Sequence, residues 1–228
     1  MQEVWEDTGR VVVHTTWGEW LTAVLADPGL RPLLGRDWPR YRQQAAAEGR
    51  YRFAVSRMVV KYAAAAVLQV DAAGLDLGYK PGGRPFLRGL GAGVDVSLAH
   101  TGDLIVVGVS RSGPIGVDAE PADRRPSVEL MGAHVCTAAE AAELAALGEE
   151  ERALRFLQLW TLKEAYTKAL GHGMRRRFSA FGFTRDAGGR IVLDSDDPGA
   201  AAWSLATHLV QGRYLLSTAH RAAAGASP

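Results

Sequence analysis

Two carboxylates lie one residue apart in the apolar segment 115–121, which reads IGVDAEP. If this segment is a β-strand, Asp118 and Glu120 point to the same face, because strand side chains alternate. Two like charges side by side are unfavourable unless a positive group lies near them. We therefore expect a cation at this face of the strand.

A third carboxylate lies in the strongest predicted helix, residues 149–170. Trp160, Glu164 and Lys168 are spaced four residues apart, so they lie on one side of this helix. Mg²⁺ takes oxygen ligands, keeps several waters and binds substrate phosphates together with a few carboxylates. The three acids therefore predict a metal site for phosphoryl or pyrophosphate chemistry, in which Lys168 meets a phosphate. Taken singly, the same features also fit an exposed strand end and a surface Glu–Lys pair.

The chain around these residues predicts a mixture of strands and helices. Apolar patterns indicate strands at 11–15, 94–100, 104–110, 115–120, 180–184, 202–209 and 214–219. Helices are expected at about 45–70, after a capping box that begins at Thr137, and at 149–170 before Gly171. The segment 78–93 is expected to be a loop, 111–114 a hairpin turn and 222–228 disordered. Strands and helices without regular alternation favour the α+β class.

Composition bounds the function further. The chain has 228 residues, 47% of them hydrophobic, which is enough for one large domain or two packed lobes. A net charge of +1 argues against a dedicated nucleic-acid binder. The single cysteine, Cys136, excludes an internal disulfide and fits a reducing compartment. Because the first residues lack an apolar core and no apolar run is long enough to span a bilayer, we expect a cytoplasmic protein without a membrane segment.

The acids belong to a longer ordered pattern that resembles a known family. The sequence resembles the two-part signature of the 4′-phosphopantetheinyl transferase superfamily at 116–120 (GVDAE) and at 160–171 (WTLKEAYTKALG). Segments 83–85 (GRP) and 97–100 (SLAH) are similar to two further family motifs. The length is similar to that of the larger, two-lobed members, which activate surfactin-type peptide synthetases.

The resemblance implies an activity and its partners. Such enzymes transfer the 4′-phosphopantetheine arm of coenzyme A to a serine of an apo acyl or peptidyl carrier protein, which leaves 3′,5′-ADP. The implied cofactor is Mg²⁺, with Mn²⁺ as an alternative, and coenzyme A is the co-substrate. The carrier is expected to be acidic and transiently bound, as in fatty acid, polyketide or nonribosomal peptide biosynthesis. No nucleic acid or membrane is expected as a partner, and the chain is expected to be a monomer.

The family's residues carry over to matching positions. Asp118, Glu120 and Glu164 would hold the metal, and Glu164, Lys168 and Asp118 would be catalytic, with Glu164 also serving as general base. The expected coenzyme A contacts are Arg52, Arg57, Arg84, His100, Lys163 and Lys168. For Arg52 and Arg57 a solvated helix face is an alternative, and for Lys163 a surface charge. Ala99 departs from the family, which often has a hydroxyl there.

The resemblance also implies the architecture, namely two similar α+β lobes, 1–112 and 113–228, about a pseudo-two-fold axis with coenzyme A in the cleft between them. Arg175, Arg176 and Arg177 are either solvated charges or a rim for an acidic carrier. Two other functions stay open. One is a family member that binds coenzyme A or a carrier without transfer, and the other is a three-carboxylate metal phosphohydrolase or nuclease.

Overall fold

The computed structural model describes residues 1–26, 29–171, 176–195 and 198–222. Residues 223–228, within the tail expected to be disordered, and Arg175 of the basic run lie outside these ranges. The chain divides into two compact units, Met1–Ser112 and Gly113–Pro228. Each unit combines helices with antiparallel sheets, so the α+β class is confirmed. Within the described ranges, no helix is both long enough and apolar enough to cross a bilayer.

The first unit is built on a three-stranded sheet and one long helix. Its sheet has the order β1-β5-β4, and a separate hairpin pairs β2 with β3. Helix α5 packs on β5, and its buried side chains form the core together with the inner faces of the strands. The elements are α1 (Gln2–Thr8), β1 (Arg10–Thr16), α2 (Leu21–Ala26), α3 (Leu30–Leu34), α4 (Trp38–Gln43), α5 (Ala47–Leu68), β2 (Asp76–Tyr79), β3 (Pro85–Arg88), β4 (Asp95–Thr101) and β5 (Leu104–Ser110).

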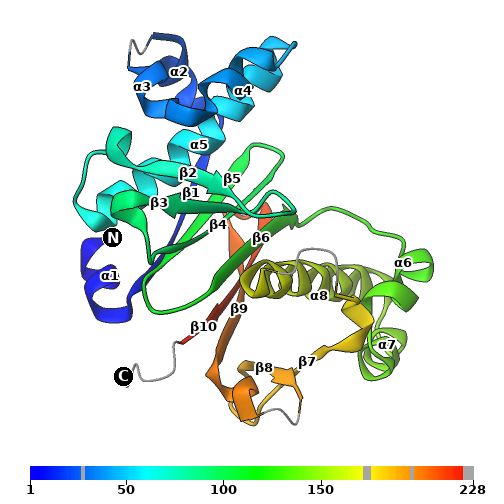
Figure 1. Ribbon diagram of the computed structural model, residues 1–228. Helices are drawn as coiled ribbons and strands as arrows, with labels where there is room; N and C mark the ends of the chain where they lie inside the picture. The colour runs from blue at the N-terminus through cyan, green and yellow to red at the C-terminus, as the bar shows by residue number, and fades with distance from the viewer. Residues whose placement is uncertain (27–28, 172–175, 196–197, 223–228) are drawn as a thin grey trace. The chain divides into compact units, whose positions relative to one another are not determined.

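The second unit has the same kind of scaffold. Its sheet has the order β6-β10-β9, a hairpin pairs β7 with β8, and α8 lies along β6 and β10 (Figure 1). The elements are β6 (Ile115–Pro121), α6 (Val128–Val135), α7 (Ala138–Ala145), α8 (Glu149–Leu170), β7 (Gly182–Arg185), β8 (Ile191–Asp194), β9 (Trp203–Val210) and β10 (Tyr214–Arg221).

The two units have the same topology. In each, a seven-residue strand precedes a 22-residue helix, a short hairpin and two final strands, and the first strand pairs with the last. The order β1-β5-β4 in one unit therefore corresponds to β6-β10-β9 in the other. The pseudo-two-fold arrangement of the units stays a prediction.

Most predicted elements are confirmed, and two predictions are wrong. Helix α8 has the predicted bounds, and Thr137 with Glu140 forms the expected capping box at the start of α7. The segment 78–93 is not a loop throughout, because it contains part of β2 and all of β3. The hairpin predicted around 111–114 is also wrong. Strand β5 pairs with β1 and β4, whereas β6 pairs with β10, so the strands on either side of this turn belong to different sheets.

Candidate active site

A glycine sets how closely the site's helix approaches its strand. Gly116 is the second residue of β6, and a Cβ atom placed there would lie 1.8 Å from the carbonyl oxygen of Ala165 and 2.6 Å from the amide nitrogen of Ala169. Only a residue without a side chain therefore permits this contact between β6 and α8. The close approach brings Glu164 and Lys168, which are both partly buried, to the strand that carries the two acids.

Lys168 supplies the positive charge expected beside Asp118. Its ammonium donates to the Asp118 carboxylate at 2.7 Å and to the Val117 carbonyl at 3.2 Å. Burial raises the pKa of Asp118, and the charge of Lys168 opposes this shift. A carboxylate in this position is costly to leave unpaired, so the lysine and the acid stabilise each other.

Glu120 has a second cation, which the sequence reasoning missed. Arg124 follows four residues later and forms an ion pair with the Glu120 carboxylate. The side chain of Arg124 is 42% exposed, against 17% for that of Glu120, so the pair lies at the surface of the unit. The opposite charges at this spacing were the available signal, but Glu120 lies in a strand, where such a spacing has no fixed meaning.

Glu164 interacts electrostatically with Asp118, Glu120 and Lys168. Burial raises its pKa most, the negative charges of Asp118 and Glu120 raise it further, and Lys168 lowers it. The three predicted acids are therefore close enough to interact. They are not gathered as a metal cage, since no cluster of three His, Cys, Asp or Glu side chains among the described residues could hold an ion. Instead, Asp118 is paired with Lys168, and Glu120 is paired with Arg124.

The donor set nonetheless fits a hard cation. Carboxylate oxygens are the ligands that Mg²⁺ prefers, and a divalent ion would relieve the repulsion that raises the pKa of Glu164. When bound beside a diphosphate, Mg²⁺ supplies neutralisation of the charge that develops on the leaving group.

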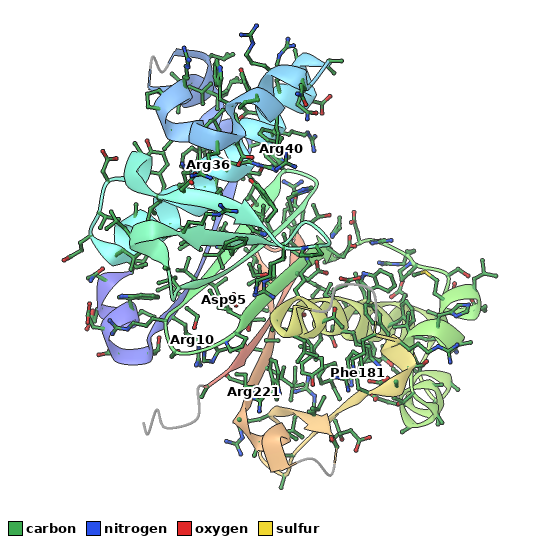
Figure 2. The ribbon with its side chains drawn as sticks, in the orientation of Figure 1. Arg10, Arg36, Arg40, Asp95, Phe181 and Arg221 are labelled. Atoms are coloured by element: carbon green, nitrogen blue, oxygen red, sulfur yellow. The ribbon has the colours of Figure 1, made fainter. Side chains whose placement is uncertain are left out.

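Lys163 is directed into the interior, away from these acids. Its side chain is fully buried, and its ammonium donates to Glu140 at 2.6 Å and to the carbonyls of Phe178 and Phe181 at 2.9 Å and 2.7 Å (Phe181 is labelled in Figure 2). Both roles expected for Lys163 are corrected, because it is neither a surface charge nor accessible to coenzyme A. All three of its donors are used inside the unit.

Glu140 completes this buried network. Besides the Lys163 ammonium, its carboxylate accepts the backbone N–H groups of Thr137 and Phe183 at 2.8 Å and 3.0 Å. Burial lowers the pKa of Lys163, and the carboxylate of Glu140 opposes that shift. The pair ties α7, β7 and α8 together, which fixes the rotation of α8 about its axis and therefore the direction of Glu164 and Lys168.

In the first unit, two of the predicted coenzyme A contacts are held in largely buried ion pairs. Arg57 lies over the Phe53 ring, donates to the Tyr79 hydroxyl at 3.2 Å and lies 3.9 Å from Asp37. Its side chain is 18% exposed, so neither a solvated helix face nor an open phosphate contact describes it. Arg84 forms an ion pair with Asp95, and its side chain is 13% exposed. Both arginines support the fold of this unit.

Asp37 is the centre of the Arg57 network. This buried carboxylate also accepts from the Tyr79 hydroxyl and pairs with Arg40 at 3.2 Å (Arg40 is labelled in Figure 2). Burial and the hydrogen bond to Asp37 raise the pKa of Tyr79 to about 12. Sequence reasoning missed this network, because the acid is 20 residues from the arginine it holds.

Arg52 and His100, by contrast, meet at one aromatic residue. The Arg52 guanidinium lies 5.3 Å from the centre of the Trp17 ring, and the His100 ring lies 5.5 Å from it in an edge arrangement. Both side chains are exposed to solvent. Of the coenzyme A contacts predicted in this unit, these two are the ones that the structure brings together, although they are 48 residues apart in sequence. No sequence signal indicated Trp17.

Comparisons with known proteins show which family this chain resembles. The model of the 4′-phosphopantetheinyl transferase superfamily matches residues 114–219, which include Asp118, Glu120, Glu164 and Lys168. A 4′-phosphopantetheinyl transferase of Bacillus subtilis is 26% identical over 150 residues, which are 66% of this chain and 65% of that protein. The 4′-phosphopantetheinyl transferase HetI of a Nostoc species is 28% identical over 164 residues, which are 69% of this chain and 65% of that protein.

The match therefore spans less than two thirds of these relatives' own lengths. Among solved structures, the holo-[acyl-carrier-protein] synthase of Neisseria meningitidis aligns with 47% of this chain and 97% of its own. Its identity of 20% and TM-score of 0.38 are too low to support an argument. The sequence comparisons and the ordered motifs agree: residues 114–219 of this chain are similar to the 4′-phosphopantetheinyl transferase superfamily.

Proposed function

We propose that this protein transfers the 4′-phosphopantetheine group of coenzyme A to a serine hydroxyl of an apo carrier protein. The observation that carries the proposal is the close contact of β6 and α8 at Gly116, which sets Glu164 and Lys168 beside Asp118. A lysine and three carboxylates, of which Glu164 interacts electrostatically with the other two, fit a diphosphate with its metal ion. The match to the superfamily model and the names of the relatives support the same reaction.

The reaction needs a proton acceptor, a diphosphate contact and charge neutralisation. The serine oxygen attacks the phosphorus that carries the pantetheine arm, and the bond from that phosphorus to the leaving 3′,5′-ADP breaks. Glu164 is suited to take the serine proton, directly or through a water, because burial and the neighbouring acids raise its pKa. The nucleophile comes from the carrier, so this chain needs no nucleophile of its own.

Lys168 has the second role. In the structure its ammonium is bound to Asp118, and a diphosphate would offer it a competing partner of higher charge. Asp118, Glu120 and Glu164 would hold Mg²⁺. On the first unit, Arg52 and His100 are the residues proposed to contact a phosphate of coenzyme A. Their exposure and their shared position at Trp17 support this assignment.

The test is an intact-mass assay with coenzyme A, Mg²⁺ and a panel of apo acyl and peptidyl carrier proteins. We expect a carrier to gain the mass of one phosphopantetheine, and we expect chelator or Glu164→Gln to abolish the gain. Stabilisation of the protein by coenzyme A without any gain on any carrier would favour the binding-only alternative. The proposal would be refuted if no carrier gained mass and coenzyme A did not stabilise the protein.

The finer expectations are part of this proposal. An acidic carrier partner predicts association that weakens as salt increases, and Arg176 and Arg177 are the described residues of the basic run that could contribute. Sedimentation in the absence of carrier tests the expected monomer. Cytoplasmic location is tested by fractionation of the source cells.

A further inference from the structure

Trp17 is fixed by three hydrogen bonds to neighbouring segments of the first unit. It follows β1 directly and is 6% exposed. Its indole N–H donates to the Gly102 carbonyl at 3.0 Å, and its backbone N–H donates to the Asp103 carbonyl at 3.1 Å. Its own carbonyl accepts from the Tyr51 hydroxyl. The residue is thus fixed both to the turn between β4 and β5 and to helix α5.

The Trp17 ring contacts two side chains from different elements. Arg52 extends from α5 over the ring, at 5.3 Å, and His100 extends from β4 to within 5.5 Å of it. Arg52 is also paired with Glu48 at 3.0 Å, but that pair is exposed on one helix and fixes nothing relative to β4. Trp17 is the residue whose contacts join Arg52 to His100.

We propose that Trp17 is a positioning residue that holds Arg52 and His100 together as one subsite for the 3′-phosphate of coenzyme A. The inference rests on the proposed function and adds a residue to it. A free arginine side chain loses considerable rotational freedom when it binds a phosphate, and an aromatic face that already restrains it reduces that loss. Tryptophan is the aromatic residue that attracts a guanidinium most strongly.

The alternative is that Trp17 only fills the core. The two roles differ in what they predict for ligand discrimination. A core role affects coenzyme A and 3′-dephospho-coenzyme A alike, because damage to the fold does not depend on the 3′-phosphate. A positioning role affects coenzyme A selectively, because only that ligand carries the group that Arg52 and His100 would contact.

The experiment measures the dissociation constants of both ligands, with Mg²⁺, for the wild-type protein, Trp17→Leu and Trp20→Leu. Trp20 is a matched control in the same segment, where it packs on Tyr62 and donates to Thr15. We expect Trp17→Leu to reduce the preference for coenzyme A about fivefold, the loss of a cation–π contact and of its preorganisation. Trp20→Leu is expected to leave the preference unchanged. Equal weakening of both ligands by Trp17→Leu would overturn the inference.

Two further measurements keep the inference testable. If Trp17 acts through Arg52 and His100, then Trp17→Leu has no further effect on the preference for coenzyme A when Arg52→Ala and His100→Ala are already present. An additive effect of Trp17→Leu in that background would refute the inference. If Trp17→Leu does not fold, Trp17→Phe replaces it, with a loss of about twofold expected because phenylalanine attracts cations less strongly. An unchanged preference in that variant would overturn the inference. A wild-type protein that binds neither ligand would instead refute the proposed function.

Discussion

The substitution Gly116→Ala tests whether the contact between β6 and α8 creates the site. The added Cβ would lie 1.8 Å from the Ala165 carbonyl oxygen, whereas real Cβ contacts are essentially absent below 3.0 Å. The helix backbone must therefore retreat by about 1.2 Å. The obstructing atom is backbone, so no side-chain rotation can relieve the clash.

Two effects of this displacement are expected. Overpacking of a tight contact costs about 1–3 kcal/mol of unfolding free energy, and a backbone clash belongs at the upper end of that range. A misplacement of about 1 Å in a catalytic group can lower the rate about a hundredfold. Because the displaced helix carries Glu164 and Lys168, we expect the loss of kcat/KM to exceed what partial unfolding explains.

The assay follows carrier mass gain with time, beside urea unfolding of the same sample. The matched control is Gly132→Ala in α6, where the nearest atom to an added Cβ is 3.9 Å away. That variant should retain activity and gain slightly in stability, because alanine favours a helix over glycine. Wild-type activity and stability in Gly116→Ala would show that α8 does not approach β6 as the structure has it, and the reasoning about the site would fail.

Three other predictions follow from buried or paired charges. Lys163→Met should lower the free energy of unfolding by about 3–5 kcal/mol, because it leaves the Glu140 carboxylate buried without its cation. Adding Glu140→Gln should recover part of this free energy, as measured by urea unfolding. Burial and the charge of Glu140 raise the pKa of Cys136 from 9.0 to about 11, so the folded thiol stays protonated while the unfolded one ionises. Stability should therefore fall between pH 9 and about 11, and a Cys136→Ala variant should lose this slope. Arg124→Ala should lower the dissociation constant for Mg²⁺, about threefold by calorimetry, because Arg124 competes for Glu120, whereas Arg125→Ala should not.

The parts of the fold that were predictable are those fixed by local sequence. Helix α8 was predicted with the observed bounds because acidic residues fill its first turn and Gly171 ends it in a left-handed conformation. The predicted hairpin around 111–114 failed because strand pairing is not local. The turn chemistry there is genuine, but β6 finds its partner, β10, only at residues 214–221. Nothing near the turn encodes that pairing.

In the site, too, local features were predictable and contacts with distant segments were not. Strand and helix periods predicted that Asp118 and Glu120 share one face of the strand and that Glu164 and Lys168 share one side of the helix. The pairing of Lys168 with Asp118 was not predicted, because these periods do not determine which strand a helix packs on. The direction of Lys163 was not predictable, since a residue next to Glu164 on a helix can belong to either the buried or the open side. Its partners, Glu140 and the carbonyls of Phe178 and Phe181, come from segments on both sides of α8 in sequence.

The repeated topology explains why the scaffold alone does not determine the chemistry. Lys61 and Lys163 are each the fifteenth residue of a 22-residue helix, both are buried, and both donate to backbone carbonyls. The two units thus share a buried lysine that anchors the long helix. The following positions differ, since the places of Glu164 and Lys168 on α8 are taken on α5 by Tyr62 and Ala66.

The first strands differ in the same way. By position in their seven-residue strands, Asp118 and Glu120 of β6 correspond to Val13 and Thr15 of β1. The same kind of sheet and helix therefore carries three acids in the second unit and no acid at the matching positions of the first. Because the shared lysine maintains the helix in both units, its loss should damage folding in either unit. Loss of Glu164, by contrast, should damage transfer with little effect on folding, because the first unit maintains the same scaffold with Tyr62 at the matching position.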